Sequence, residues 1–277
     1  MNSNDMMSMD RELENTHRAL WALGDYATVA TDLVAPLGSL LVDAVGVRTG
    51  HRVLDVAAGS GNVAIPAALS GADVIASDLC PALLDSGRKL ADARGARLRW
   101  QEANAEELPF ADGEFEIVLS CLGVMFAPHH RRAADELIRV CRPGGTIGLI
   151  SWTPEGFIGE MFATIKPYVA APPSGASPPL WGREEYVRDL LGDRVVEFVA
   201  RRRTLRIETF ADGAAFRDYF KSHYGPTISA YNGIASEPAR VAALDAALAE
   251  LGDRHLVESP AMEWEYLLIT CCKAQPA

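Results

Sequence analysis

The residues best suited to hold a ligand lie in a glycine-rich segment, Val53 to Asn62. Its turn, Ala57-Ala58-Gly59-Ser60-Gly61, follows a short apolar run and precedes a helical pattern. Glycines in such a turn let the backbone approach a ligand closely, and the start of a helix supplies unpaired N–H donors. Turns of this kind occur in dinucleotide-binding and other nucleotide-binding proteins, and also without any ligand. The turn alone therefore predicts a nucleotide-like ligand without choosing one.

Three polar side chains, each at the end of a predicted strand, indicate which nucleotide-like ligand the turn binds. Asp55 lies just before the turn, where a carboxylate repels a pyrophosphate but suits a cation such as the amino group of an amino acid. Asp78 ends the next strand, and a carboxylate there can accept hydrogen bonds from both hydroxyls of a ribose or cap the following helix. The segment from Asn104 to Phe110 follows a third strand. An amide beside a free backbone N–H can read an adenine edge, although a polar loop would look the same.

These residues need a scaffold of alternating strands and helices. Strands are predicted at 52–56, 73–77, 97–103, 115–120 and 146–152, with helices at 62–69, 81–93 and 131–141 between them. Such alternation predicts a parallel sheet covered by helices on both faces, with ligands bound beyond the carboxyl ends of the strands. The remaining predictions are two helices over 20–47 interrupted near Gly24-Asp25 and Pro36, helices at 183–191, 211–222 and 237–251, extended segments at 195–207 and 261–272, and a loop at 171–179.

Composition limits the partners and the compartment. The chain has 277 residues and a formal net charge of -11, so a nucleic acid or an anionic membrane surface is not expected as a partner. The residues from Met1 to Glu14 are polar, and no stretch reaches the ~18 apolar residues of a membrane span, so we expect a cytoplasmic protein. The five cysteines are scattered and show no zinc spacing, so no metal site is predicted.

The stretch from Val53 to Trp152 resembles the class I S-adenosylmethionine-dependent methyltransferases, and within them the ubiquinone/menaquinone-biosynthesis (methyltransferase type 11) subfamily. The motifs that carry the resemblance are Val53–Gly61, Ser77–Leu79, Asn104–Phe110 with Asp112–Phe115, and Glu136–Gly145. The segment Trp21–Tyr26, with the pattern Trp-x-x-Gly-x-Tyr, is also similar to the N-terminal cap of that group.

The resemblance implies a fold for the whole chain. It is an α/β, Rossmann-like seven-stranded methyltransferase sheet with helices on both faces and a helical cap, in a single domain over 1–277. Its parts are an N-terminal helical cap over 1–48, a cofactor-binding core over 49–153, a variable substrate cap and loop over 154–260, and a terminal strand over 261–277.

The resemblance also implies S-adenosyl-L-methionine as the cofactor. Its methionine part is expected at Asp55 and at Ala57, Gly59 and Gly61 of the turn. Asp78 is expected to hold the ribose, Leu79 to line the adenine, Asn104 and Ala105 to read it, and Ser120 to lie near the sulfonium. This sequence departs from the family twice, because the family usually has glycine at the position of Ala57 and aspartate at the position of Asn104.

Methyl transfer from a sulfonium is an in-line displacement, so aligning the acceptor is the main requirement, and a base is needed only for a protonated acceptor. The candidate bases are His129, after the fourth strand, and His223 and Tyr224 in the variable cap. The alternative explanation is solvent exposure before a helix for His129, and packing within the cap for His223 and Tyr224. An apolar acceptor site is predicted from Tyr26, Met125, Trp152 and Phe157, which core packing would also place inside.

The sequence thus predicts methyl transfer to a small, apolar or aromatic metabolite such as a quinone, a polyketide or another secondary metabolite. Two alternatives stay open: an S-adenosylmethionine-binding protein of this fold with non-methylating chemistry such as cyclisation, and a nicotinamide-dependent oxidoreductase, against which Asp55 and Asn104–Phe110 argue. The expected partner is a small-molecule acceptor. The identity of the acceptor, the methylated atom and a homodimeric state are left open.

Overall fold

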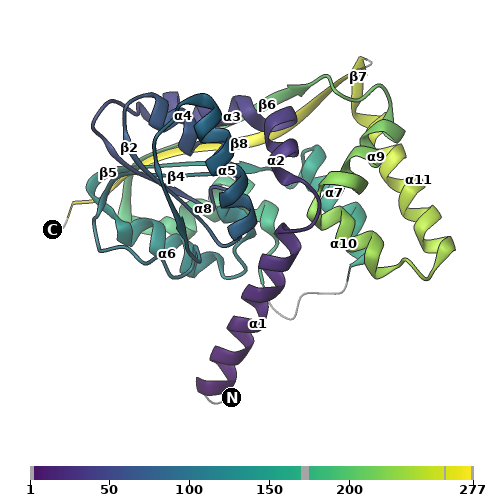
Figure 1. Ribbon diagram of the computed structural model, residues 1–277, viewed down its shortest axis with the longest axis horizontal. Helices are drawn as coiled ribbons and strands as arrows, with labels where there is room; N and C mark the ends of the chain where they lie inside the picture. The colour runs from purple at the N-terminus through teal and green to yellow at the C-terminus, as the bar shows by residue number, and fades with distance from the viewer. Residues whose placement is uncertain (1–2, 170–174, 259, 276–277) are drawn as a thin grey trace.

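The computed structural model describes residues 3–169, 175–258 and 260–275. One twisted sheet runs through the body, and helices cover both of its faces (Figure 1). The strands lie in the order β3 (Arg99–Glu102), β2 (Asp73–Asp78), β1 (Arg52–Val56), β4 (Phe115–Cys121), β5 (Cys141–Trp152), β8 (Ala261–Lys273) and β6 (Val195–Ile207). A short strand, β7 (Leu256–Glu258), pairs with the start of β8.

The pairing directions follow the connections between the strands. The five strands from β3 to β5 pair in parallel, because helices connect most of them. β8 is antiparallel to both β5 and β6. The predicted Rossmann-like sheet with helices on both faces is therefore confirmed. The edge strand β6 coincides with the extended segment predicted at 195–207, within the part of the chain (154–260) that was assigned to the variable cap and loop.

The helices of the N-terminal half are α1 (Ser3–Trp21), α2 (Tyr26–Val29), α3 (Ala35–Val45), α4 (Ala64–Leu69), α5 (Pro81–Arg94) and α6 (His130–Val140). The ends of α5 follow from its sequence, since Pro81 occupies the first turn and Gly95 ends the helix in a left-handed conformation. Helix α6 buries Ala133, Leu137 and Ile138, which lie on one face at helical spacing.

The helices of the C-terminal half are α7 (Phe157–Ile165), α8 (Glu184–Leu191), α9 (Gly213–His223), α10 (Gly225–Gly233) and α11 (Pro238–His255). Helices α9, α10 and α11 gather at one end of the molecule beside α7 (Figure 1). Part of the predicted loop 171–179 lies outside the described residues, and its end begins a 3₁₀-helix, Pro178–Gly182.

Helix α3 anchors the N-terminal cap to the sheet. The segment Tyr26–Val45 is long and apolar enough to cross a membrane by length and composition, with a mean hydropathy of 1.5. In this fold that hydropathy has another explanation, because Leu37 and Leu41 are fully buried and α3 packs on β4 and β5. The predicted interruption near Pro36 is confirmed: a π-helical turn, Ala30–Val34, separates α2 from α3, and Pro36 lies in the first turn of α3.

Candidate cofactor and acceptor site

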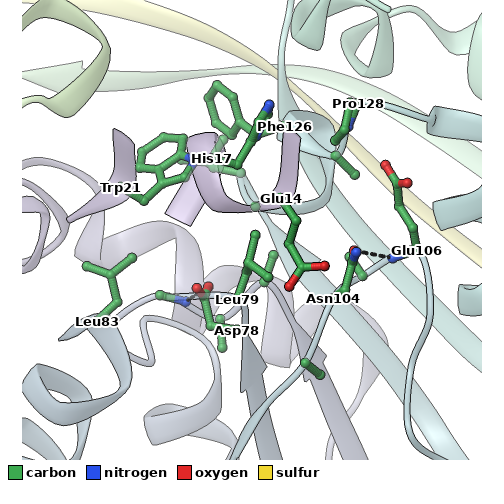
Figure 2. Close-up of a pocket in the computed structure, with 18 of the residues that line it drawn as sticks. Glu14, His17, Trp21, Asp78, Leu79, Leu83, Asn104, Glu106, Phe126 and Pro128 are labelled. Atoms are coloured by element: carbon green, nitrogen blue, oxygen red, sulfur yellow. Dashed lines mark hydrogen bonds between the residues drawn. The ribbon is translucent and has the colours of Figure 1, made fainter. Parts of the chain in front are cut away.

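A cavity of about 360 Å³ lies at the carboxyl ends of the parallel strands, beneath α1 (Figure 2). Its size is within the range of small-molecule sites. It is lined from α1 and α2, from the turn after β1, and from the segments that follow β2, β3 and β4. The chain therefore brings the ends of four successive strands to one place, as the rule for open α/β sheets requires.

The turn after β1 forms the floor of the cavity. Ala57 and Gly59 line it, whereas Gly61 lies behind them against Trp100 and Ile65. Ala57 has a φ of 54° and Gly59 a φ of 56°, so both have the left-handed conformation that favours glycine. In the described part of the chain, a Cβ on Gly59 would meet only the Tyr26 ring, at 3.5 Å, so the absence of a side chain there keeps this part of the cavity open.

Asp55 lies under the turn and carries an unpaired buried oxygen. Its Oδ2 accepts a hydrogen bond from the Ala64 N–H at 2.9 Å, and its Oδ1 has no partner among the described residues. Burial raises the pKa of Asp55 to about 8. A cationic amino group is the ligand chemistry that such a carboxylate accepts.

Asp78 faces the cavity at the end of β2. Its Oδ2 accepts from the Gly59 N–H and its Oδ1 from the Cys80 N–H, each at 2.8 Å. Burial raises the pKa of this carboxyl, while those two hydrogen bonds oppose the shift. Each oxygen keeps a second lone pair, so the group can still accept from ligand hydroxyls.

The segment after β3 supplies the opposite side of the cavity. Asn104 and Ala105 line it together with Leu79, the residue that follows β2. The Asn104 Oδ1 accepts from the Glu106 N–H at 2.9 Å, which closes a tight turn. An adenine between Leu79 and this turn would meet an apolar face and polar edges.

Ser120 is placed differently from the expectation that it lies near the sulfonium. It is fully buried, donates to the Val56 carbonyl at 2.6 Å and accepts from the Val124 N–H at 3.0 Å. Through these two hydrogen bonds Ser120 connects the end of β1 to the segment that follows β4. The next residue, Cys121, lines the cavity, and burial raises the pKa of its thiol.

Aromatic rings close the cavity on the side of the cap. The Trp21 ring lies 5.4 Å from Tyr26 and 4.7 Å from Phe126, centroid to centroid, with both pairs edge to face. The three rings line the cavity. Tyr224 packs behind them, 6.0 Å from Trp21, and is itself buried.

His129 is the one predicted base that lines the cavity. Its Nδ1 lies 2.7 Å from Oε2 of Glu106, and its backbone N–H donates to the other carboxylate oxygen at 2.6 Å. This pairing makes Nδ1 the protonated nitrogen and leaves Nε2 as an acceptor. His17, from α1, faces the pair, and burial lowers its pKa against a smaller opposing effect of Glu106.

Four further predicted residues do not line the cavity. The His223 ring stacks on Tyr219 at 4.5 Å, and its Nδ1 bonds the Tyr219 carbonyl. Met125 is fully buried in the core. Trp152 and Phe157 pack around Trp264, at 5.9 and 5.3 Å. For Met125, Trp152 and Phe157 the structure thus favours the core-packing alternative.

Leu13, Glu14 and Glu106 were not predicted as site residues, and Trp21 was predicted only as part of the cap motif. These four residues line the cavity together with His17 and Phe126. The signal was present, because the spacing of four between Leu13, His17 and Trp21 places them on one helical face. Nothing in the sequence indicated that this face turns toward the sheet.

The residues present fit the implied cofactor. Asp55 offers an unpaired buried acceptor for an amino group, and Asp78 offers acceptors for two hydroxyls. The open space at Gly59 admits a chain between them, and Ala105 and Leu79 border an apolar slot. A pyrophosphate at the turn would instead lie against the Asp78 carboxylate and close to Asp55, which is buried beneath the turn and does not line the cavity, and this argues against a dinucleotide.

Comparisons with known proteins agree with this geometry. Residues 53–145 match the family described as Methyltransferase domain. The chain is 55% identical over 269 residues to the uncharacterized protein Rv1405c of Mycobacterium tuberculosis, covering 95% of this chain and 96% of that protein. It is 36% identical to a demethylmenaquinone methyltransferase of Thermus thermophilus over 39% of this chain and 50% of that enzyme.

A solved structure of a putative methyltransferase from Bacillus halodurans superposes with a TM-score of 0.57 at 20% identity, over 86% of this chain and 98% of the other. At that identity the likeness shows the fold. The fold, the matching family and the donor set agree. The chain therefore belongs to the class I S-adenosylmethionine-dependent methyltransferases, and its cofactor is S-adenosyl-L-methionine.

Proposed function

We propose that this methyltransferase acts on a small aromatic or apolar metabolite, such as a quinone, a polyketide or another secondary metabolite. The observation that carries the proposal is the aromatic wall of Trp21, Tyr26 and Phe126, which borders the same cavity as the cofactor-binding turn. Rings arranged edge to face present apolar surfaces to a flat ligand. The partial match to an enzyme named for demethylmenaquinone supports the same class.

The protein acts mainly by positioning. The cofactor, when bound, supplies a methyl group already activated on a sulfonium. Asp55 and Asp78 hold its two polar ends, and the aromatic wall orients the acceptor and excludes water. Holding reacting atoms about 3–3.5 Å apart in line accounts for much of the rate of such a displacement.

His129 is the base in this proposal, for an acceptor that carries a proton. Its Nδ1–H is held by Glu106 at 2.7 Å, so Nε2 is the atom that takes the proton of the acceptor hydroxyl. Glu106 is a positioning residue, since it sets the tautomer of the ring. We place the reaction in the cytoplasm, with the small molecule as the partner and without nucleic acid or membrane, in keeping with the net charge of -11.

The test has two stages. Thermal unfolding with S-adenosylmethionine, S-adenosylhomocysteine and NAD should show stabilisation by the first two alone. A ligand at a hundred times its Kd should raise the free energy of unfolding by about 2.7 kcal/mol. The enzyme is then given S-adenosylmethionine with a trideuteromethyl label and a panel of naphthols, hydroxynaphthoquinones, phenols, amines and fatty acids. Labelled product is expected from the aromatic hydroxyl compounds.

A matched pair of variants ties the result to the aromatic wall. Phe126→Ala should raise the acceptor KM about tenfold, equivalent to about 1.4 kcal/mol. Phe110→Ala, which removes a ring that packs on Phe115 outside the cavity, should leave KM unchanged. Label found only on amines or fatty acids would contradict the aromatic class. Saturable S-adenosylhomocysteine binding with no labelled compound would favour non-methylating chemistry.

A further inference from the structure

The loop after β3 carries a neutral hydrogen-bond acceptor, the Asn104 side-chain amide, which already accepts one hydrogen bond within the loop. The Asn104 Oδ1 accepts from the Glu106 N–H, and the Glu107 N–H donates to the Asn104 carbonyl at 3.0 Å. The amide thus stabilises the turn of its own loop. An adenine amino group placed here is a donor that a charged acceptor would bind more strongly.

A carboxylate enters the same space from α1. Glu14 lines the cavity, and Figure 2 shows its side chain directed from the helix toward the loop that carries Asn104. It is half-buried, and it lies on the helical face that also presents His17 and Trp21. A carboxylate has acceptors only, so it selects ligand groups that donate hydrogen bonds.

Arg18 holds this carboxylate in place. Its Nη2 donates to Oε1 of Glu14 at 3.0 Å, and its Nη1 donates to Oε1 of Glu102. Glu102 is the last residue of β3 and stands two residues before Asn104. The guanidinium therefore links α1 to the strand that carries the loop. The bond from Arg18 uses Oε1 of Glu14, and Oε2 is the second acceptor of the same group.

We propose that Glu14 reads the adenine of the cofactor by accepting the hydrogen bond of its 6-amino group. Asp78 already accounts for the acceptors required by the ribose, at the end of the neighbouring strand. Helix α1 then determines base specificity, with Arg18 as a positioning residue. This inference rests on the cofactor assignment and is independent of the acceptor.

Calorimetric titration with S-adenosylhomocysteine tests the proposal without turnover. Glu14→Gln should weaken binding about tenfold or more, since a hydrogen bond to a charged group is replaced by one to a neutral amide. The control is Glu12→Gln, which removes the same charge from an exposed position on α1 that does not line the cavity. It should bind like the parent protein.

The decisive ligand is S-inosylhomocysteine, in which an oxygen replaces the 6-amino group. The parent protein should disfavour it strongly, because two acceptors would face each other. Glu14→Gln should lose most of that discrimination, since the glutamine amide can donate to the new oxygen. Arg18→Met should reduce the discrimination less than Glu14→Gln.

The outcomes separate the two assignments. Equal loss of affinity for both ligands in Glu14→Gln, or unchanged discrimination, would overturn the role of Glu14. Failure of the parent protein to bind S-adenosylhomocysteine would instead overturn the cofactor assignment. An unchanged unfolding midpoint of ligand-free Glu14→Gln shows that the fold is intact, and a lowered midpoint with retained discrimination would assign Glu14 a structural role only.

Discussion

Ala57 combines a left-handed backbone with a close neighbour. Its φ is 54°, and a Cβ built on Gly123 would lie 2.1 Å from the Ala57 carbonyl oxygen and 2.7 Å from its Cβ. Alanine in this region costs about 1–2 kcal/mol relative to its usual conformations. The alanine methyl is therefore accommodated because residue 123 has no side chain.

Ala57→Gly should stabilise the protein. Removing the left-handed penalty outweighs the extra flexibility of glycine in the unfolded chain, so the free energy of unfolding should rise by about 0.5–1 kcal/mol. Urea unfolding monitored by circular dichroism measures it. Gly123→Ala should have the opposite effect and serves as the companion variant. A less stable Ala57→Gly protein would show that the methyl contributes packing that exceeds the strain.

Asp55 makes cofactor binding depend on pH. Burial raises its pKa from 3.8 to about 8, so its contribution to folding stability is full below about pH 4 and is lost as the pH rises through about 8. A bound amino group favours the ionised carboxylate. Binding must therefore release the Asp55 proton at pH values below about 8, and affinity must rise with pH in that range.

We expect the affinity for S-adenosylhomocysteine to rise between about pH 6 and pH 8, by at most tenfold per unit, with up to one proton released. Calorimetry in buffers of different ionisation enthalpy measures both quantities. Asp55→Asn should bind weakly and without this slope. An equal slope in Asp55→Asn would assign the titration to another group.

The elements of the cofactor half were predicted from hydrophobic period and turn residues, because those patterns are local. The strands at 52–56, 73–78 and 115–121 lie within one residue of prediction. β5 was predicted from Thr146 but starts at Cys141, because Cys141 pairs with Phe115 and the irregular residues 142–145 lie between that pair and the next one, Thr146 with Ile117. Pro143 therefore follows the end of α6, as predicted, but it lies within β5, whose pairing with β4 has already begun at Cys141.

Helices α7 and α10 were not predicted. Helix α10 lacks a clear amphipathic period, and α7 is apolar over most of its nine residues, so neither has the long polar face of a typical surface helix. Local sequence patterns also limit what can be predicted of the site. Asp78, Asn104 and His129 could be assigned to the cavity because the ends of parallel strands converge in this topology. Glu14 and Trp21 line it because of the way α1 docks, which no local pattern encodes.

The junction between α1 and α2 depends on Gly24. Its φ is 70°, and a Cβ there would lie 2.5 Å from the His223 carbonyl oxygen. Gly24→Ala should lower the free energy of unfolding by about 2 kcal/mol, through both strain and overlap. Gly46 has nearly the same φ, 69°, and no atom of the described residues lies within 4 Å of a Cβ built there, so Gly46→Ala should cost only about 1 kcal/mol. Equal urea midpoints for the two variants would contradict the tight junction.

Stability is distributed unevenly over the molecule. The strands β1, β4 and β5 are buried in the centre of the sheet, whereas α1 projects from the body, and Leu13 is its only buried side chain between residues 11 and 21 (Figure 1). Segments with few buried contacts open most readily. Hydrogen exchange should therefore be fastest in α1 and slowest in the central strands.

Cofactor binding should change this distribution. Because Glu14, His17 and Trp21 line the cavity, S-adenosylhomocysteine should slow exchange across residues 11–21 as well as in the turn 57–61. Mass spectrometry of peptic fragments, with and without the ligand, measures both segments. Protection of the turn without protection of α1 would show that the helix does not close on the ligand.

The insertion of β8 between β5 and β6 has a consequence for how the protein is made. The strand Ala261–Lys273, which follows β6 in the chain, is the one that joins β6 to the rest of the sheet, because β6 pairs with no other strand among the described residues. During translation β6 therefore stays unpaired on both edges until β8 has left the ribosome. A message truncated before codon 261 would thus yield a chain with a complete cofactor turn and an unfinished sheet, which chaperones would bind and proteases would degrade.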